Sequence, residues 1–130
     1  MVANADTWLS LGVRQLANSN CSAIVAVHVP NSTRYGSLKL EGEKICAFEE
    51  KLGSDGCGYV NSGLYHLLPE VFDGFEVGSE FSIESEVFPR LVSVRQLAAV
   101  KLNSNFIDIG IPEDYSKFCK WVESGREYEL

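Results

Sequence analysis

The sequence predicts an α/β domain with a mixed sheet. Its 130 residues, of which 45 % are hydrophobic, are enough for one buried core and too apolar for a disordered chain. Short segments with the two-residue period of strands alternate with segments of helical period. Residues 22–29 (SAIVAVHV) are apolar almost throughout, which is typical of a strand covered on both faces of its sheet. We therefore expect residues 1–130 to belong to one domain.

The N-terminal part of the chain predicts a strand, a helix and a second strand. Residues 2–6 (VANAD) are expected to form a strand that ends at Asp6. Apolar residues at helical spacing predict a helix over about residues 9–17, and the buried strand at 22–29 follows it. Asp6 would then lie at a turn between a strand and a helix.

The middle of the chain predicts a hairpin and a long strand. Residues 36–40 and 45–50 have strand character and flank a short segment that contains Gly42, which is typical of a hairpin turn. Residues 52–58 (LGSDGCG) predict a loop, and residues 58–67 predict a strand.

The last third of the chain predicts helices on either side of two strands. Pro69 suits the first position of a short helix, and Ser82 suits an N-cap. The expected elements are, in order, a short helix, a helix, two strands and a final helix, over residues 69–72, 81–93, 96–102, 105–109 and 112–124.

The composition argues against several kinds of partner. The net charge of −7 is unsuited to nucleic acid polymers and acidic membranes, since both need basic surface. No apolar run approaches the roughly 18 residues of a membrane span, and the N-terminus lacks the layout of a signal peptide. We therefore expect a cytoplasmic protein.

The cysteines and histidines have no metal-ligand spacing. We expect buried free thiols, and neither a zinc site nor a disulfide framework. The residues concerned are Cys21, Cys46, Cys57, Cys119, His28 and His66.

Asp6 and Asp108 have similar surroundings in the sequence. Each is expected at the end of a short apolar strand, just before a helix. Ligands collect outside the carboxyl ends of strands in open α/β sheets, where two aspartates could share one Mg²⁺. Alternatively, both could be helix caps that accept hydrogen bonds from backbone N–H groups. The residues alone leave both possibilities open.

Three other segments place polar residues or glycines near predicted strands. Glu50 could accept from sugar hydroxyls and Lys51 could hold a phosphate, although both also fit a solvated strand end. Asn61 interrupts an apolar strand just before Gly63, which either admits a ligand to the backbone or marks a β-bulge. Gly36 can be explained by the start of the hairpin.

Six motifs, taken in order, resemble the sugar-1-phosphate nucleotidyltransferases, and within them the heptose- and mannose-1-phosphate guanylyltransferases. The motifs are NADT, RYG, FEEK, YVNSGLY, FSIESEVFP and FIDIGIPEDY, and the likeness runs from about Val2 to Phe118. No single motif is decisive, whereas their common order is highly specific.

The resemblance implies a reaction and a set of site residues. A sugar 1-phosphate oxygen attacks the α-phosphorus of a nucleoside triphosphate, with GTP favoured by the closer likeness, and pyrophosphate leaves. Asp6 and Asp108 match the family's two magnesium-binding aspartates. Lys51 matches the lysine that contacts the sugar phosphate. The implied sugar contacts are Gly36, Glu50 and Asn61.

The resemblance also implies a Rossmann-like domain with a mostly parallel sheet, in which the hairpin is an insertion. Ala5 stands where the family's NGD motif has glycine, and Ile111 stands where threonine is common. The family's glycine-rich loop GGxGxR, which holds the triphosphate and the base, has no counterpart in the sequence. We therefore expect the C-terminal, sugar- and metal-binding part of such a domain, without its N-terminal strands and inactive by itself.

Such a part is expected to form homo-oligomers, because open strand edges and uncovered apolar faces promote self-association. One alternative is a non-catalytic module that binds sugar phosphates or has a regulatory role. Another is a degenerate relative that is kept for assembly with a partner. Both alternatives have less need of two metal-binding aspartates.

Overall fold

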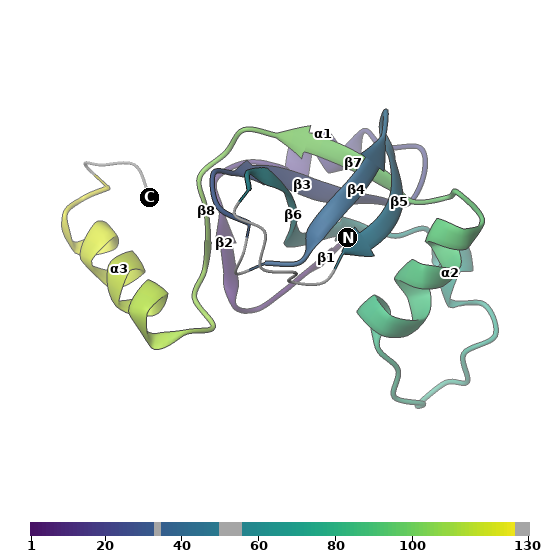
Figure 1. The fold of residues 1–130 in the computed structure, drawn as a ribbon. Helices are drawn as coiled ribbons and strands as arrows, with labels where there is room; N and C mark the ends of the chain where they lie inside the picture. The colour runs from purple at the N-terminus through teal and green to yellow at the C-terminus, as the bar shows by residue number, and fades with distance from the viewer. Residues whose placement is uncertain (33–34, 50–55, 127–130) are drawn as a thin grey trace.

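A mixed sheet of six strands forms the centre of the molecule, and a two-stranded sheet lies beside it (Figure 1). This computed structural model describes residues 1–32, 35–49 and 56–126. In their order across the larger sheet, the strands are β1 (Val2–Ala3), β6 (Gly58–His66), β3 (Ala23–Val29), β7 (Ala98–Leu102), β5 (Lys44–Glu49) and β4 (Ser37–Glu41). The smaller sheet pairs β2 (Thr7–Leu9) with β8 (Phe106–Asp108). The α/β class is therefore confirmed.

The strand directions correct one part of the prediction, since the larger sheet is not mostly parallel. β3 and β7 are parallel, whereas the other neighbouring strands are antiparallel. The short turn at Gly42 makes β4 and β5 an antiparallel hairpin, as expected. β6 then runs antiparallel beside β3, and only the longer helical connection after β6 returns the chain parallel to β3 in β7.

β3 is buried on both faces, which confirms the prediction for residues 22–29. Ile24 and Ala26 enter one core cluster, while Val25 and Val27 enter a second one on the opposite face. All four are at most 1 % exposed. The alternation of side chains along a strand explains this division. The sheet therefore separates the interior into two layers.

The first core cluster is covered by helical turns that follow β6. A 3₁₀ turn, η1, spans Pro69–Phe72, a π-helical turn, η2, spans Ile83–Val87, and α2 spans Phe88–Ser93. The predicted helix at 81–93 is thus present, although its first turn is π-helical. Ser82 caps it as expected, because its Oγ accepts a hydrogen bond from the Ser85 amide at 3.2 Å.

The predicted helix at residues 9–17 is wrong in its first part. Thr7–Leu9 form β2, and α1 spans only Val13–Ala17. β2 pairs along its whole length with β8, and this long-range pairing overrides the local helical pattern. Gly12 separates the two elements with φ of 134°, and a Cβ there would lie 3.0 Å from Leu64 Cδ2. The predicted strand at 2–6 is likewise shorter, because β1 ends at Ala3.

α3 (Pro112–Glu123) supports the smaller sheet and confirms the last predicted helix. Trp8 of β2 packs edge-on against Trp121 of α3, with ring centroids 4.6 Å apart. Phe118 lies 6.0 Å from the same Trp8 ring. Figure 1 shows α3 on the side of the molecule where β2 and β8 lie. The two-stranded sheet is therefore held between α3 and the rest of the domain.

The four thiols are free, but the expectation that they are buried is wrong. Cys57 is exposed just before β6, and the other three are half-buried: Cys21 lies in the turn before β3, Cys46 lies within β5 and Cys119 lies within α3. Among the residues that the structure describes, no helix is both long and apolar enough to cross a membrane.

Candidate active site

The pairing of β2 with β8 brings Asp6 and Asp108 together. Thr7 pairs with Asp108 in the antiparallel register, so Asp6 lies one residue before the pair. The amide of Ile109 donates a hydrogen bond of 2.7 Å to the backbone carbonyl of Asp6. Asp108 ends its strand as predicted, whereas Asp6 lies in the turn between β1 and β2 and precedes a strand.

The two carboxylates converge beside Gly110. A Cβ on Gly110 would lie 3.0 Å from Asp108 Oδ1 and 3.2 Å from Asp6 Oδ2. Because both oxygens are within 3.2 Å of one point, their separation cannot exceed twice that distance. Carboxylates more than about 10 Å apart could not share a magnesium ion at Mg–O distances of about 2.1 Å. The spacing of Asp6 and Asp108 is therefore compatible with one shared cation.

Neither aspartate is a helix N-cap, which was the alternative explanation. α1 begins after Gly12 and α3 begins after Ile111, and neither N-cap residue makes a side-chain capping hydrogen bond. Asp108 instead accepts a hydrogen bond of 2.9 Å from the Gly110 amide through Oδ1. This short turn leaves the second oxygen, Oδ2, available to a ligand.

A β-bulge in β6 positions the turn that carries Asp6. The register between β3 and β6 shifts here, and Gly63 has φ of 75°. A Cβ on Gly63 would lie 2.7 Å from Thr7 Oγ1 and 2.9 Å from Asn4 Cβ. The Gly63 carbonyl accepts a hydrogen bond of 2.7 Å from the Asn4 amide. The close approach at Gly63 is therefore made by the chain's own turn, and the bulge interpretation is confirmed.

One hollow of about 290 Å³ gathers most of the predicted site residues. Asp6, Asp108, Gly36 and Asn61 all line it. The other residues around it are Asn4, Thr7, Tyr35, Phe48, Glu84 and Phe106. We refer to this hollow as the acidic pocket. Its lining combines carboxylates, amides and aromatic rings, which suits a cation or a small polar ligand with hydroxyl groups.

Gly36 and Asn61 border the acidic pocket in different ways. Gly36 lies against the end of β5, where a Cβ would be 3.3 Å from the Glu49 carbonyl oxygen. Asn61 Oδ1 accepts from the Gly63 amide at 3.0 Å, and its Nδ2 donates to the Tyr65 hydroxyl at 3.1 Å. These two bonds fix the Asn61 amide, which retains a second N–H and a second acceptor site for a ligand.

Tyr65 forms the buried support beneath Asn61. Only 2 % of the residue is exposed, and burial raises the pKa of its hydroxyl to about 12. The negative charges of Glu84 and Asp6 raise that pKa further, while hydrogen bonds with Asn61 and Asn4 lower it. The hydroxyl is therefore protonated at neutral pH and remains available as a hydrogen-bonding partner.

Two predicted site residues, Glu50 and Lys51, lie outside the described residues. The pocket also contains residues that the sequence did not single out, above all Glu84 and Tyr35. Both occur in the motifs FSIESEVFP and RYG, but helical and hairpin periodicity gave no reason to prefer them to their neighbours. Their place beside Asp6 depends on long-range packing.

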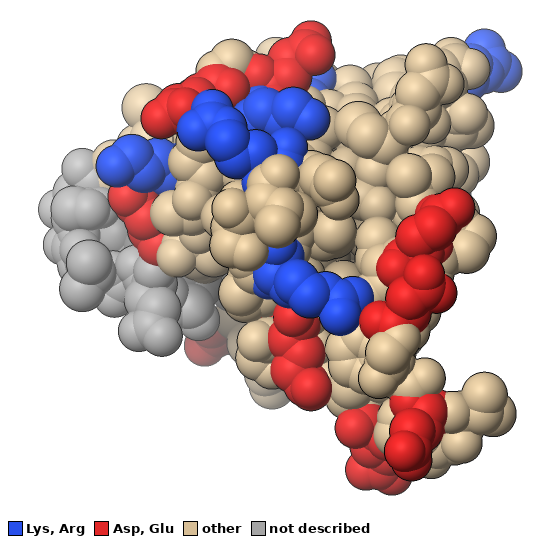
Figure 2. Space-filling model, turned by 90° about the vertical axis from the view of Figure 1, so that its right-hand side faces the viewer, with Lys and Arg blue, Asp and Glu red and all other residues tan. Residues whose placement is uncertain are grey.

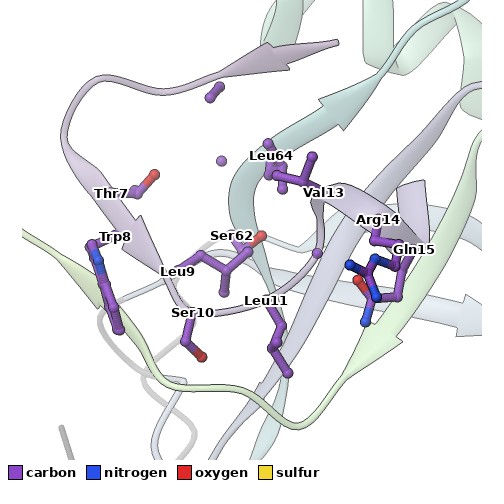
Figure 3. A pocket seen from close by; sticks show the side chains of 13 residues that line it. Thr7, Trp8, Leu9, Ser10, Leu11, Val13, Arg14, Gln15, Ser62 and Leu64 are labelled. Atoms are coloured by element: carbon purple, nitrogen blue, oxygen red, sulfur yellow. The ribbon is translucent and has the colours of Figure 1, made fainter. Parts of the chain in front are cut away.

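A second, larger hollow of about 550 Å³ adjoins β2 and α1 (Figure 3). The side chains of Leu9, Leu11 and Leu64 surround it, and Arg14 and Gln15 lie at one side. Thr7 lines both hollows. We refer to it as the apolar hollow; it contains none of the described site residues that the sequence predicted.

Comparisons with known proteins identify the family of the chain. A family profile described as "Nucleotidyl transferase" matches residues 9–124. The D-glycero-alpha-D-manno-heptose 1-phosphate guanylyltransferase of Campylobacter jejuni is 30 % identical, over 90 % of this chain and 53 % of that protein. The mannose-1-phosphate guanylyltransferase catalytic subunit beta of Drosophila melanogaster is 32 % identical, over 97 % of this chain and 36 % of that protein.

A solved structure shows the same fold. The crystal structure of HddC from Yersinia pseudotuberculosis superimposes with a TM-score of 0.78 at 31 % identity, over 92 % of this chain and 53 % of that chain. The chain therefore spans about half the length of HddC and of the Campylobacter relative. Since the profile match covers most of the sequence and the fold agrees with that of HddC, this chain belongs to the nucleotidyl transferase family.

Proposed function

We propose that this chain supplies the sugar-1-phosphate- and metal-binding part of a sugar-1-phosphate guanylyltransferase. The observation that carries the proposal is the meeting of Asp6 and Asp108 in one pocket with Gly36 and Asn61. This arrangement offers carboxylates for a cation that binds phosphate and polar groups for a sugar ring.

The two aspartates fit Mg²⁺ as the cation. Mg²⁺ prefers oxygen ligands and usually takes one or two carboxylates, with water and substrate phosphates completing its shell. The described parts of the chain contain no group of three acidic, histidine or cysteine side chains that could hold a metal. Asp6 and Asp108 would therefore hold the ion from one side. Bound there, Mg²⁺ would neutralise negative charge on the phosphates during transfer.

In the proposed reaction, an oxygen of the sugar 1-phosphate forms a bond to the α-phosphorus of GTP. The bond from that phosphorus to the oxygen that bridges to the β-phosphate breaks, and pyrophosphate leaves. Such transfers depend on positioning and charge neutralisation, so no covalent enzyme intermediate is needed. Lys51 would hold the sugar phosphate and Glu50 would accept from a sugar hydroxyl.

The choice of GTP and of a sugar rests on the relatives. Those with about 30 % identity are named for guanylyl transfer to a manno-heptose 1-phosphate or to mannose 1-phosphate. We therefore take GTP, D-glycero-α-D-manno-heptose 1-phosphate and mannose 1-phosphate as the first substrates to test.

We propose that the N-terminal half of the nucleotidyltransferase domain would pack over the apolar hollow of this chain. Leu11 and Val13, which both line this hollow, are 53 % and 61 % exposed, so they place two large apolar side chains together at its rim. Thr7 connects this hollow to the acidic pocket, so a half that packed there would adjoin the proposed site. The groups that hold the triphosphate and the base would come from that half. The chain alone is then expected to lack transferase activity.

A pyrophosphate-release assay tests this function. The complete gene product that contains this chain is incubated with Mg²⁺, each common nucleoside triphosphate and each of the two sugar phosphates. We expect metal-dependent release with GTP and at least one sugar phosphate, and none from residues 1–130 alone. Absence of release with every pair would reject the enzyme proposal in favour of a non-catalytic sugar-phosphate-binding module.

A further inference from the structure

Glu84 belongs to η2 and lines the acidic pocket, whereas Asp108 reaches the same pocket from β8 of the smaller sheet. The Glu84 side chain lines the pocket together with Asp6, Asp108 and Asn61. Tyr65 lies beneath Asn61, and Glu84 contributes more than Asp6 to the electrostatic rise in the Tyr65 pKa. The Glu84 carboxylate therefore adjoins the Asn61–Tyr65 group as well as the aspartates.

The turn that carries Glu84 is held by its neighbours. Ser82 Oγ accepts from the Ser85 amide at 3.2 Å, and Glu86 Oε1 accepts from the Ser82 amide at 2.8 Å. Val87 is fully buried in the core. Among the described residues, the Glu84 carboxylate makes no hydrogen bond or ion pair. One-turn π-helices of this kind frequently occur at functional sites.

Acidic side chains are common around η2, and most of them have no contact with the pocket. The segment contains Glu76, Glu80, Glu84 and Glu86, and Figure 2 shows acidic side chains on the lowest part of the molecule, where Figure 1 places the loop before η2. Of these four, only Glu84 lines the acidic pocket. Its place in the pocket is what distinguishes it from an ordinary solvated glutamate.

Glu84 does not complete the metal site. A third carboxylate close to Asp6 and Asp108 would form a three-ligand group, and the described residues contain none. An ionised carboxylate that is not a metal ligand can only accept hydrogen bonds, and it repels phosphate. Among the groups of a sugar 1-phosphate, those that suit it are the ring hydroxyls, which can donate to both of its oxygens.

We propose that Glu84 determines sugar specificity by accepting hydrogen bonds from ring hydroxyls of the sugar 1-phosphate. The inference rests on the proposed function, because it takes the ligand of the acidic pocket to be a sugar 1-phosphate. The ligand lies with its phosphate toward Asp6 and Asp108 and its ring between Glu84 and Asn61. The charge of Glu84 disfavours the reverse orientation.

Ligand binding to residues 1–130 tests this role without requiring turnover. Mannose 1-phosphate is titrated in the presence of Mg²⁺ and followed by ligand-observed NMR. The dissociation constant is expected to rise about tenfold in Glu84→Gln, because one of the two acceptor oxygens becomes an NH₂ donor and the remaining hydrogen bond is no longer to a charged group. The control is Glu80→Gln, which removes a charge from the same segment outside the pocket and should bind like the parent.

Deoxy analogues of mannose 1-phosphate identify the hydroxyl concerned. The parent should lose affinity when the hydroxyl that contacts Glu84 is absent, and Glu84→Gln should lose much less for the same analogue. Equal affinity of parent and Glu84→Gln, equal losses for every analogue, or no binding to the parent would each overturn the role of Glu84. Failure of the proposed transferase function would appear separately, as sugar phosphate binding without pyrophosphate release by the complete gene product.

Discussion

The two hollows that adjoin β2 differ in size and in chemistry. The apolar hollow is the larger, at about 550 Å³ against about 290 Å³, and leucine side chains dominate its wall. The acidic pocket brings together carboxylates and an amide from distant parts of the chain. Volume alone would favour the apolar hollow, whereas the smaller hollow gathers the convergent polar groups that orient a small ligand. The larger hollow therefore has the character of a packing surface.

One short strand produces both environments. Thr7 pairs with Asp108 and fixes the aspartate at the edge of the acidic pocket, while Leu9 faces the apolar hollow. Trp8, which also lines the apolar hollow, packs on Trp121 of α3. A shift of this pairing by one residue would exchange the two faces of the strand. The Trp8 anchor and the Gly63 bulge hold it in register.

The largest expected effect comes from removing one charge from the acidic pocket. Asp108→Asn keeps the shape of the side chain but weakens the proposed cation site, so kcat of the complete gene product should fall about a hundredfold to a thousandfold. Its thermal unfolding should change little. The control Asp73→Asn alters an exposed aspartate outside both hollows and should leave kcat near the parent value. A parent-like kcat in Asp108→Asn would remove that residue from the mechanism.

The second prediction concerns the bulge at Gly63, which lies against Asn4 and Thr7 on either side of the turn that carries Asp6. Gly63→Ala places a methyl group 2.7 Å from Thr7 Oγ1 at φ of 75°, so the free energy of unfolding should fall by about 3 kcal/mol. Gly42→Ala is the matched control, because its φ is 62° but no atom lies within 4 Å of the new Cβ. The free energy of unfolding of Gly42→Ala should fall by only about 1 kcal/mol. Urea unfolding measures both losses, and equal losses would show that the turn at Asp6 does not depend on close approach to Gly63.

The third prediction uses the buried hydroxyl beneath the acidic pocket. The pKa of Tyr65 is raised to about 12 in the folded protein, so its contribution to stability is complete below pH of about 10 and is lost as the pH rises toward 12. Between these pH values, the titration of Tyr65 should lower the free energy of unfolding by up to about 1.4 kcal/mol per pH unit. Tyr65→Phe should remove that part of the slope. Parallel slopes in parent and variant would place the Tyr65 hydroxyl in a more polar environment than its burial indicates.

The sequence predicted the elements whose signals are local. The apolar run of β3, the hairpin around Gly42 and the periodicity of α3 each lie within a few consecutive residues, and the structure confirms them. β2 could not be predicted in this way, because three residues become a strand only through their pairing with β8. The expectation of a mostly parallel sheet came from the family resemblance and did not follow from the strand pattern.

The distinction between local signals and long-range packing also explains which residues of the acidic pocket could be predicted. Asp108 was singled out by its position at the end of a strand, and it lies there. Asp6 was singled out for the same reason but reaches the pocket through a turn that the Gly63 bulge accommodates. Glu84 was missed, because helical periodicity makes it an ordinary exposed residue and only long-range packing places it in the pocket.

The smallest expected effect on stability belongs to the rim of the apolar hollow. Self-association was expected because β3 would lack cover, but β3 is covered within the chain, and exposed apolar surface lies instead at Leu11 and Val13. In the absence of an N-terminal half, a second copy of residues 1–130 should cover that rim at micromolar concentration.

Replacing Leu11 and Val13 together by serine should yield a monomer while changing the free energy of unfolding by only about 0.5 kcal/mol. Val77→Ser, a fully exposed position outside both hollows, is the control and should leave the oligomer intact. Size-exclusion chromatography with light scattering measures the masses; a monomeric parent, or a double variant that stays associated, would show that the apolar hollow is not the surface that joins the copies.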